Sequence, residues 1–234
     1  MKSDMSSLLK RVGCLQIIIA MIALFSFPAY ADDSFFELCK KGTIADITKA
    51  LKDGRDINEP DEKKRTPLMG AARENTPEVV SFLLKKGASV NERDMYGQSS
   101  LWFATMNKNL DVAKLLLKAG ATLEGTTPNG FTLLMSAAEE CGNPDVIPLL
   151  ITAGASIREH NTEGVTPLMT ASGLNKNADV VRKLLKAGAS VKERTADGKT
   201  PLMWAAMQTN NPEIIQVLIK AGASVKDRDT NKAT

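Results

Sequence analysis

The 234-residue chain has few of the residues from which catalytic and metal sites are usually built. It contains one histidine, three cysteines and two tryptophans, and only 5% of its residues are aromatic. A glycine-rich phosphate loop, a Cys-x-x-Cys pair and a Ser/His/Asp arrangement are all absent. The formal net charge is only +3, so the sequence offers no basic footprint for nucleic acid. We therefore expect no enzyme activity, no cofactor, no metal and no nucleic-acid partner.

The first 31 residues have the order of a secretory signal peptide. Three basic residues precede an almost wholly apolar run at 12–27, and Ala-Tyr-Ala follows at 29–31. An uncleaved membrane anchor is the alternative, but this run is shorter than the roughly 20 residues that span a bilayer. We expect cleavage after Ala31, which leaves residues 32–234 without a membrane segment.

The part that remains after cleavage has little charge and little cysteine. Three basic residues and one acidic residue leave with the signal peptide, so the net charge falls from +3 to +1. Two cysteines remain, too few for a disulfide framework. An exported chain of this kind indicates a bacterial periplasm or secretion, and a eukaryotic secretory route is the alternative.

Two sequence markers recur in a fixed phase through residues 32–234. Thr-Pro-Leu-Met occurs at 66, 166 and 200, and related tetrapeptides at 99 and 132 keep the spacing at 33 or 34 residues. Gly-Ala recurs in step, from Gly87 to Gly222. Six repeats account for this single domain. Their approximate ranges are 33–65, 66–98, 99–131, 132–165, 166–199 and 200–234.

Each repeat reads as two helices and a hairpin finger. In the second repeat, Thr66-Pro67 opens a helix, because threonine caps it and proline is tolerated at the first helical position. The sequence from Asn75 to Glu78 opens a second helix in the same way. Gly87 supplies a left-handed stop and Gly97 a turn. Because such a unit cannot bury its own apolar faces, we expect the repeats to stack into an all-α solenoid.

These motifs resemble ankyrin repeats. The resemblance rests on the period of 33, on Thr-Pro-Leu-x-x-Ala-Ala, on Val-Val-x-x-Leu-Leu and on Gly-Ala-x-Val, and it covers essentially all of residues 32–234. It implies a non-enzymatic protein-binding module that uses its finger tips and the exposed side of each first helix, a concave face. One departure implies apolar packing between repeats, since the family's Thr-Pro-Leu-His histidine is replaced. Its replacements are Met69, Trp102, Met135, Met169 and Met203.

Counting positions from the repeat markers assigns a set of residues to this face. Several of them are apolar, although a surface that contacts only solvent does not need apolar residues. The predicted protein-binding residues are Met95, Tyr96, Gln98, Met106, Asn107, Asn129, Phe131, Glu139, Glu140, Val165, Leu174, Lys199, Met207 and Gln208. Aromatic residues and methionines beside polar neighbours are typical of an interface. The alternative is that these are isolated exposed apolar residues, which are normal, or that they pack on adjacent fingers. Trp102 and Trp204 are expected in the core.

Four further residues are of types that occur in functional sites, but a structural role explains each of them. His160 lies in a finger without convergent partners, so we expect a solvated turn residue. Cys39 takes the place of a packing alanine, and Cys141 lies in a turn three repeats away, too far for a disulfide. Pro148 is expected one turn inside a helix, where it would remove a hydrogen bond and bend the helix start.

The last repeat is as apolar as an internal one, from Ile214 to Ile219. Three alternatives explain this apolar end of the repeat array. A partner or a second copy covers it, the C-terminal tail caps it, or the reading frame is truncated. A second copy would give self-association through the C-terminal repeat.

Three functional hypotheses remain open. The first is an exported adaptor that binds a protein through the concave face. The second is an immunity or inhibitor protein that occludes a secreted or periplasmic enzyme, or an accessory protein to a stress-defence enzyme. The third, a catalytic or ligand-binding solenoid, rests only on Cys141, His160 and the pair Glu139 and Glu140.

Overall fold

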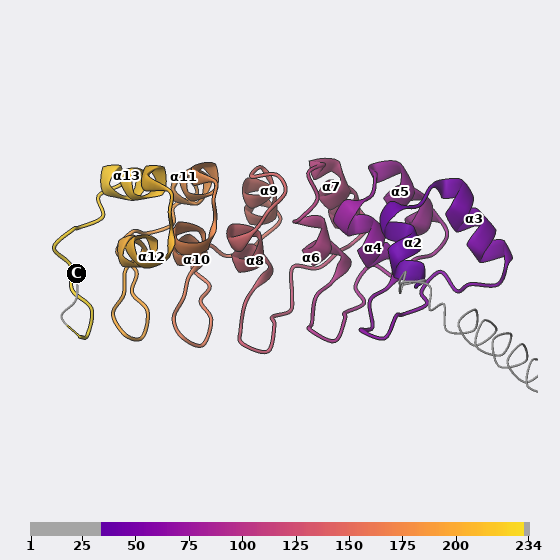
Figure 1. Cartoon of the computed structure of the whole chain (residues 1–234), viewed down its shortest axis with the longest axis horizontal. Helices are drawn as coiled ribbons and strands as arrows, with labels where there is room; N and C mark the ends of the chain where they lie inside the picture. Colours follow the sequence, from indigo (N-terminus) through magenta and orange to yellow (C-terminus); the bar gives the residue numbers. More distant parts are fainter. Residues whose placement is uncertain (1–33, 232–234) are drawn as a thin grey trace, which may run out of the picture. The chain divides into compact units, whose positions relative to one another are not determined.

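The computed structural model describes residues 34–231, and the predicted signal peptide at 1–31 lies outside them. Twelve helices and no strand occur in this range, and the helices lie in two rows with loops on one side (Figure 1). The inner helices, next to the loops, are α2 (Phe35–Lys41), α4 (Pro67–Glu74), α6 (Ser100–Ala104), α8 (Leu133–Glu139), α10 (Pro167–Leu174) and α12 (Pro201–Gln208). The outer helices are α3 (Ile44–Lys52), α5 (Pro77–Lys85), α7 (Leu110–Lys118), α9 (Val146–Thr152), α11 (Ala178–Lys186) and α13 (Pro212–Lys220).

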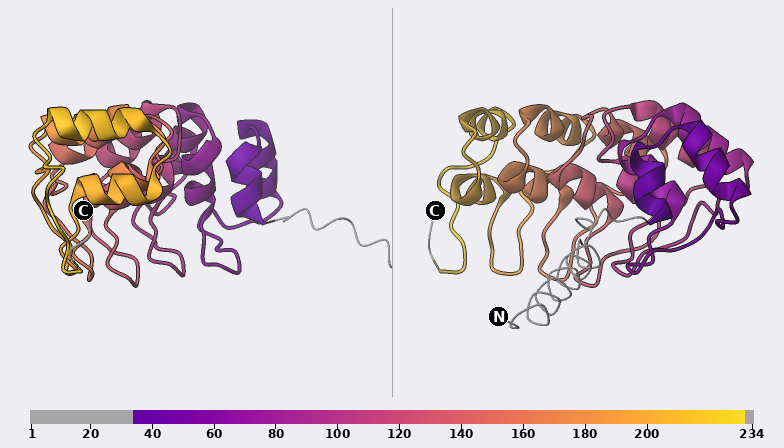
Figure 2. Two further views of the ribbon diagram at one scale, coloured as in Figure 1. Left: turned by 60° about the vertical axis from the view of Figure 1, so that its left-hand side comes forward. Right: turned by 45° about the vertical axis from the view of Figure 1, so that its right-hand side comes forward.

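The stacking follows the repeat. Each inner helix packs on the outer helix of its own repeat and on the inner helix of the next. The loops that follow the outer helices, which we call fingers, lie side by side beneath the inner row in every view (Figure 2). The prediction of six stacked helix-helix-finger units is therefore confirmed. Within residues 34–231, no helix is both long and apolar enough to cross a bilayer.

The inner helices begin as the sequence predicts. The hydroxyl of Thr66 accepts a hydrogen bond from the N–H of Met69, at 3.4 Å, and proline occupies the first helical position. Thr166 and Thr200 cap their helices in the same way. The cap satisfies one of the N–H groups that a helix start leaves without a partner.

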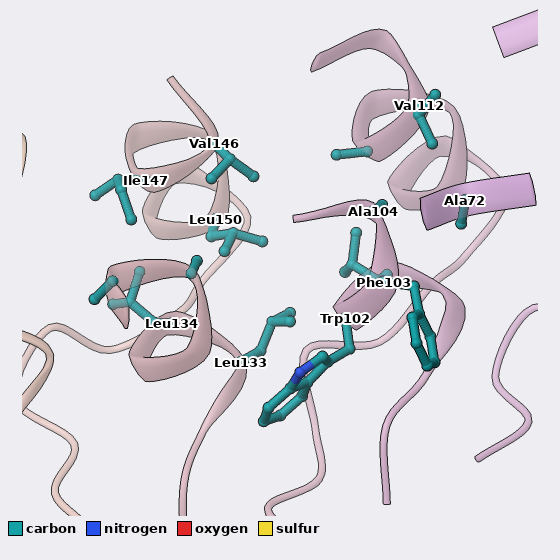
Figure 3. Packing of buried hydrophobic residues seen from close by; sticks show 14 of the residues in the cluster. Ala72, Trp102, Phe103, Ala104, Val112, Leu133, Leu134, Val146, Ile147 and Leu150 are labelled. Carbon is teal, nitrogen blue, oxygen red and sulfur yellow. The ribbon is translucent and has the colours of Figure 1, made fainter. Parts of the chain in front are cut away.

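The core lies between the two rows of helices. Leu134 of α8 and Val146, Ile147 and Leu150 of α9 pack together there, and similar side chains fill the other repeats (Figure 3). Methionines at the position of the family's histidine are buried, in keeping with the apolar packing that the departure implies.

The turns between inner and outer helices are joined by asparagine side chains. The Asn75 amide donates to the carbonyls of Cys39 and Gly42, at 2.8 and 3.0 Å. The Asn107 amide donates to the carbonyls of Ala72 and Asn75, at 3.1 and 3.0 Å. The assignment of Asn107 to the binding surface is therefore wrong, because its side chain is buried and holds two repeats together. The sequence signal was present, since an asparagine lies within four residues of the end of each inner helix from α4 to α12.

Replacing Asn107 with alanine is expected to lower the free energy of unfolding by about 1–3 kcal/mol, because a buried carbonyl and a partly buried one lose their donor. Chemical denaturation followed by circular dichroism measures the loss. Asn129→Ala, at an exposed finger position, serves as the control and should change stability by less than about 0.5 kcal/mol. Equal losses in the two variants would contradict the structural role of Asn107.

Pro148 disrupts its helix less than the sequence suggested. Helix α9 begins at Val146 after Asp145, so Pro148 is its third residue. The N–H groups of the first helical residues have no partner four residues back, so proline removes no bond of the helical ladder there. The predicted loss of a helical hydrogen bond is wrong because the helix starts later than expected.

Candidate functional site

The fingers are rigid turns stabilised by a polar side chain at their first position. In the finger at 94–98, the carboxylate of Asp94 accepts hydrogen bonds from the N–H groups of Tyr96 and Gln98, at 2.9 and 2.8 Å. Gly97 has a φ of 82°, in the left-handed region that favours glycine. This turn exposes the side chains of Met95 and Tyr96 to solvent.

Backbone hydrogen bonds join most neighbouring fingers, with one interruption. In three cases the backbone N–H of the second residue of a finger donates to the backbone carbonyl of the third residue of the preceding finger. Met95 donates to Lys63, Ala196 to Glu163 and Thr230 to Asp197, each at 3.0 Å. Pro128 occupies the donor position in the finger at 127–131 and has no N–H. Within the part of the chain that the structure describes, no backbone hydrogen bond joins this finger to either neighbour. The row of fingers is therefore interrupted on both sides of the finger at 127–131, between repeats two and three and between repeats three and four.

The inner helices are also irregular at this point. Helix α6 has only five residues, and the N–H groups of Thr105 and Met106 then bond three residues back, at 3.2 Å each. The N–H of Gly142 donates to the carbonyl of Thr105 at 3.0 Å, and a Cβ at Gly142 would collide with the backbone of Met106 and Asn107. The indole of Trp102 lies beside Leu133 of α8 (Figure 3).

A hollow of about 410 Å³ opens beside this junction, and we call it the Trp102 hollow. Its lining residues are Gln98, Trp102, Met106, Thr127, Asn129, Phe131, Ser136, Glu139 and Glu140. Six of these nine are among the residues that the repeat register assigned to the binding face. Trp102 was expected in the core, and its side chain is indeed buried, yet it also lines the hollow.

Two more hollows continue toward the C-terminus. One of about 440 Å³ is lined by Glu139, Glu140, Cys141, Leu174, Asn175, Lys176 and Asn177. Another of about 420 Å³ is lined by Gly173, Leu174, Asn175, Lys176, Gln208, Thr209, Asn210, Asn211 and Pro212. Neighbouring hollows share lining residues, so the three follow one another across repeats three to six, and we call this row of hollows the inner groove.

The acidic pair in the inner groove forms no ion pair with a described residue, although Lys176 lines one hollow together with it. Neither Glu139 nor Glu140 forms an ion pair with any described residue, and no lysine or arginine lines the Trp102 hollow. Burial, together with the nearby charge of Glu140, raises the pKa of Glu139 above its ordinary value.

The position of a residue within its finger decides whether its side chain is accessible. The second and third finger residues are exposed, whereas the fifth is half-buried or buried because it lies at the finger base, next to the following helix. Val165 occupies this fifth position and is only 3% exposed, so the prediction that it is an exposed contact is wrong. Gln98, Phe131 and Lys199 share the position and are half-buried, and Phe131 packs against the core. The ammonium of Lys199 pairs with Asp197 at 2.7 Å.

The remaining predicted positions are accessible. Leu174 and Met207 are exposed apolar residues of inner helices, Gln208 is exposed beside them, and Met106 is half-buried. Trp204 is half-buried, less enclosed than predicted. That these residues bind a partner stays a prediction.

The residues considered for chemistry are only partly brought together, because Cys141 lines one hollow with Glu139 and Glu140 whereas His160 lines a different one. Cys39 is buried and Cys141 half-buried; both are free thiols, and burial raises their pKa values to about 12 and about 11. Raised pKa values keep both thiols protonated near neutral pH. His160 is exposed, and within residues 34–231 no three histidine, cysteine or acidic side chains are grouped to hold a metal.

Comparison with known proteins agrees with this geometry. The family model for ankyrin repeats (3 copies) matches residues 35–127 and 134–229. The chain belongs to the ankyrin-repeat family. Ankyrin-repeat domains are typically non-enzymatic modules that bind other proteins. No curated protein matches the sequence.

Two solved structures are similar to this ankyrin-repeat domain. The first is a chain from the structure of the predatory endopeptidase Bd0816 from Bdellovibrio bacteriovorus in complex with immunity protein Bd3460. It is 31% identical, with a TM-score of 0.67, and the match covers 80% of this chain and 97% of that one. The second is the ankyrin-repeat domain of human ASB11, which is 25% identical with a TM-score of 0.73. That match covers 86% of this chain and 89% of the other.

Proposed function

We propose that this ankyrin-repeat protein is a non-enzymatic adaptor that binds a protein partner along the inner groove and the neighbouring finger tips. The observation that carries the proposal is the row of three neighbouring hollows that share lining residues from repeat three to repeat six. Tyr96 and Leu174 are both exposed, Tyr96 at a finger tip and Leu174 in the groove. Exposed apolar side chains next to polar ones supply the anchors that protein interfaces use.

A capture experiment tests this proposal. The protein serves as bait in a periplasmic extract beside the variant Tyr96→Ala/Leu174→Ala, and captured proteins are identified by mass spectrometry. We expect the variant to lose at least nine-tenths of a partner that the unmodified bait retains, because large exposed side chains dominate binding energy. The matched control is Ile44→Ala/Pro148→Ala, which shortens two exposed apolar side chains of the outer helices.

Two outcomes oppose the adaptor proposal. Equal capture by all three baits would move the binding surface away from the inner groove. Loss of the partner from the control bait alone would place the binding surface on the outer helices. Phe131 is left unchanged in these baits, because its packing against the core would mix a folding defect with a binding defect.

Export to the periplasm, or secretion, is part of the same proposal. It is supported by the order of charged, apolar and small residues in positions 1–31. Bait recovered from the periplasm with an intact mass that begins at Asp32 supports export, and a mass that includes residues 1–31 opposes cleavage.

A second candidate function is inhibition of an enzyme, as in an immunity protein. It is favoured by the 31% identity to a chain from a complex between an endopeptidase and its immunity protein. The two functions differ in the effect on the captured partner. An enzyme that loses activity in proportion to added protein supports the inhibitor, and an enzyme whose activity is unchanged or raised supports an accessory role, as for a stress-defence enzyme.

Self-association through the last repeat is a further proposal for the partner. Ile219 and Val225 are exposed there, beside a hollow of about 270 Å³ whose other lining residues include Leu202 and Ile215. Sedimentation of the bait at the capture concentration as a monomer would remove a second copy from the candidate partners.

A further inference from the structure

The junction between repeats three and four is held by fewer hydrogen bonds than any other junction of the described array. The N–H of Gly142 donates to the carbonyl of Thr105 at 3.0 Å. The amide of Asn143 donates to the carbonyl of Lys108 at 3.3 Å. No other hydrogen bond and no ion pair between described residues crosses this junction. Because the stability of a repeat array depends on contacts between neighbours, the array yields most easily here.

Both hydrogen bonds lie at one end of α8, in the turn that leads to α9. The backbone is tightly packed there, because a Cβ at Gly142 would lie 2.3 Å from the carbonyl oxygen of Met106. At the other end of α8, the fingers of repeats three and four touch without a backbone hydrogen bond. A Cβ at Gly130 would lie 3.3 Å from the nitrogen of Thr162, yet this N–H finds no carbonyl in the neighbouring finger. The fingers can therefore separate without breaking a hydrogen bond, whereas the turn stays fixed.

The inner helices at this junction are also less closely packed. Among neighbouring inner helices, α6 and α8 make the least contact, and α6 has only five residues. The indole of Trp102 lies beside Leu133 of α8 (Figure 3). Its N–H has no hydrogen-bond acceptor among the described residues, so apolar packing alone connects this side chain to α8. Apolar packing is non-directional, and it permits a shift of one helix against the other.

An asparagine that joins the earlier repeats is missing at this junction. The amide of Asn91 donates to the carbonyl of Gly120 at 3.0 Å, and its oxygen accepts from the N–H of Thr122 at 2.9 Å. Asn58 joins repeats one and two in the same way. The equivalent residue of repeat three is Glu124, which is exposed and bridges to no described residue of repeat four. The two later junctions lack the asparagine as well, but backbone hydrogen bonds join their fingers.

We propose that the junction between repeats three and four is a hinge between two blocks, residues 34–131 and 132–231. The blocks rotate about the turn at Gly142, as hinges concentrate movement in a few residues at the ends of elements. The fingers of repeats three and four then separate, and the Trp102 hollow widens because its lining residues come from both blocks. A partner that contacts both blocks would shift the population toward the hinge position that it binds better. The hinge is a property of the protein alone and does not rest on the adaptor function.

Distances between paired spin labels test the hinge. In the protein with its native cysteines replaced by alanine, labels at Tyr96→Cys/Glu163→Cys span the junction, and labels at Lys63→Cys/Asn129→Cys lie within the first block. All four positions are the exposed third residue of a finger, and each pair is two repeats apart, or roughly 20 Å. Double electron–electron resonance measures both distance distributions. We expect the pair that spans the junction to have a distribution at least twice as broad as the other pair.

The pair within the first block is a stringent control. It crosses the other finger contact that lacks a backbone hydrogen bond, between repeats two and three. Movement of the finger at 127–131 alone would broaden this control as much as the pair that spans the junction. Only rotation of one block against the other broadens the spanning pair selectively.

A closing variant supplies the missing bridge. Glu124→Asn puts an asparagine at the position from which Asn58 and Asn91 bond to the next repeat, where the carbonyl of Gly154 is the equivalent acceptor. We expect the distribution of the spanning pair to narrow to that of the control pair. Glu124→Ala removes the same charge without a bridge and should leave the distribution broad.

Equal widths for the two label pairs would overturn the hinge, and so would a Glu124→Asn protein whose distribution is no narrower than that of Glu124→Ala. These measurements use the protein without a partner. Failure of every bait to capture a partner would therefore remove the adaptor function and leave the hinge to be decided by the label distances.

Discussion

Replacing Leu116 with alanine is expected to lower the free energy of unfolding by about 2–5 kcal/mol, through lost apolar contacts and the cavity left behind. Leu116 is fully buried on the face of α7 that also carries Val112 and Ala113. In a domain of this size the loss corresponds to a fall in Tm of about 4–20 °C. Thermal and urea denaturation followed by circular dichroism measure it.

The control for Leu116 lies on the opposite face of the same helix. Lys114 is exposed and pairs with Asp111 at 2.8 Å, so Lys114→Ala should change stability by less than about 0.5 kcal/mol. A loss below about 1 kcal/mol in Leu116→Ala would show that the repeat register assigns the wrong face of α7 to the core.

Replacing Gly70 with alanine is expected to destabilise the first two repeats, although alanine is the better helix former. A Cβ at Gly70 would collide with the carbonyl oxygen of Phe36, so α2 and α4 must move apart. The gain in helix propensity is about 1 kcal/mol. Steric overlap with a neighbouring backbone costs more, typically 1–3 kcal/mol, and it also disturbs the packing of α2 on α4. We therefore expect a net loss of up to about 2 kcal/mol.

Gly173→Ala is the matched control for Gly70→Ala, because both replace a glycine inside an inner helix. The nearest atom to a Cβ at Gly173 is a carbon of the Trp204 ring, at 3.3 Å, and a side chain can adjust. This variant should be neutral or more stable by up to about 1 kcal/mol. Urea denaturation of both variants decides the matter, and a more stable Gly70→Ala protein would contradict the close approach of α2 and α4.

The repeat architecture could be read from the sequence because it depends on local signals. Threonine caps, proline at the first helical position and glycine in the left-handed region each act within a few residues. The apolar stripe of a helix likewise identifies its buried face, so the sequence alone assigns Leu83 and Leu116 to the core, where both are fully buried. Copying these signals at a spacing of 33 or 34 residues leaves stacking as the way to bury the apolar faces.

The candidate site was only partly readable. Register placed Met106, Asn129, Phe131, Glu139 and Glu140 on one face, and the structure brings all five to the Trp102 hollow. The position of a residue within its repeat did not predict that Val165 is buried at the base of a finger. It also did not predict that the side chain of Asn107 turns inward and donates a hydrogen bond to the preceding repeat. Exposure at these positions depends on the distance between repeats, which no single repeat specifies.

By itself, the sequence determined the number of repeats, where the inner helices begin and which helix faces form the core, because these follow from caps, turns and periodicity. Only the tertiary structure decided where the inner surface opens. The short helix α6 and the interrupted finger row at Pro128 adjoin a hollow lined by Trp102 and the unpaired pair Glu139 and Glu140. These residues belong to different repeats, and the spacing between repeats is a property of their packing and not of the local sequence.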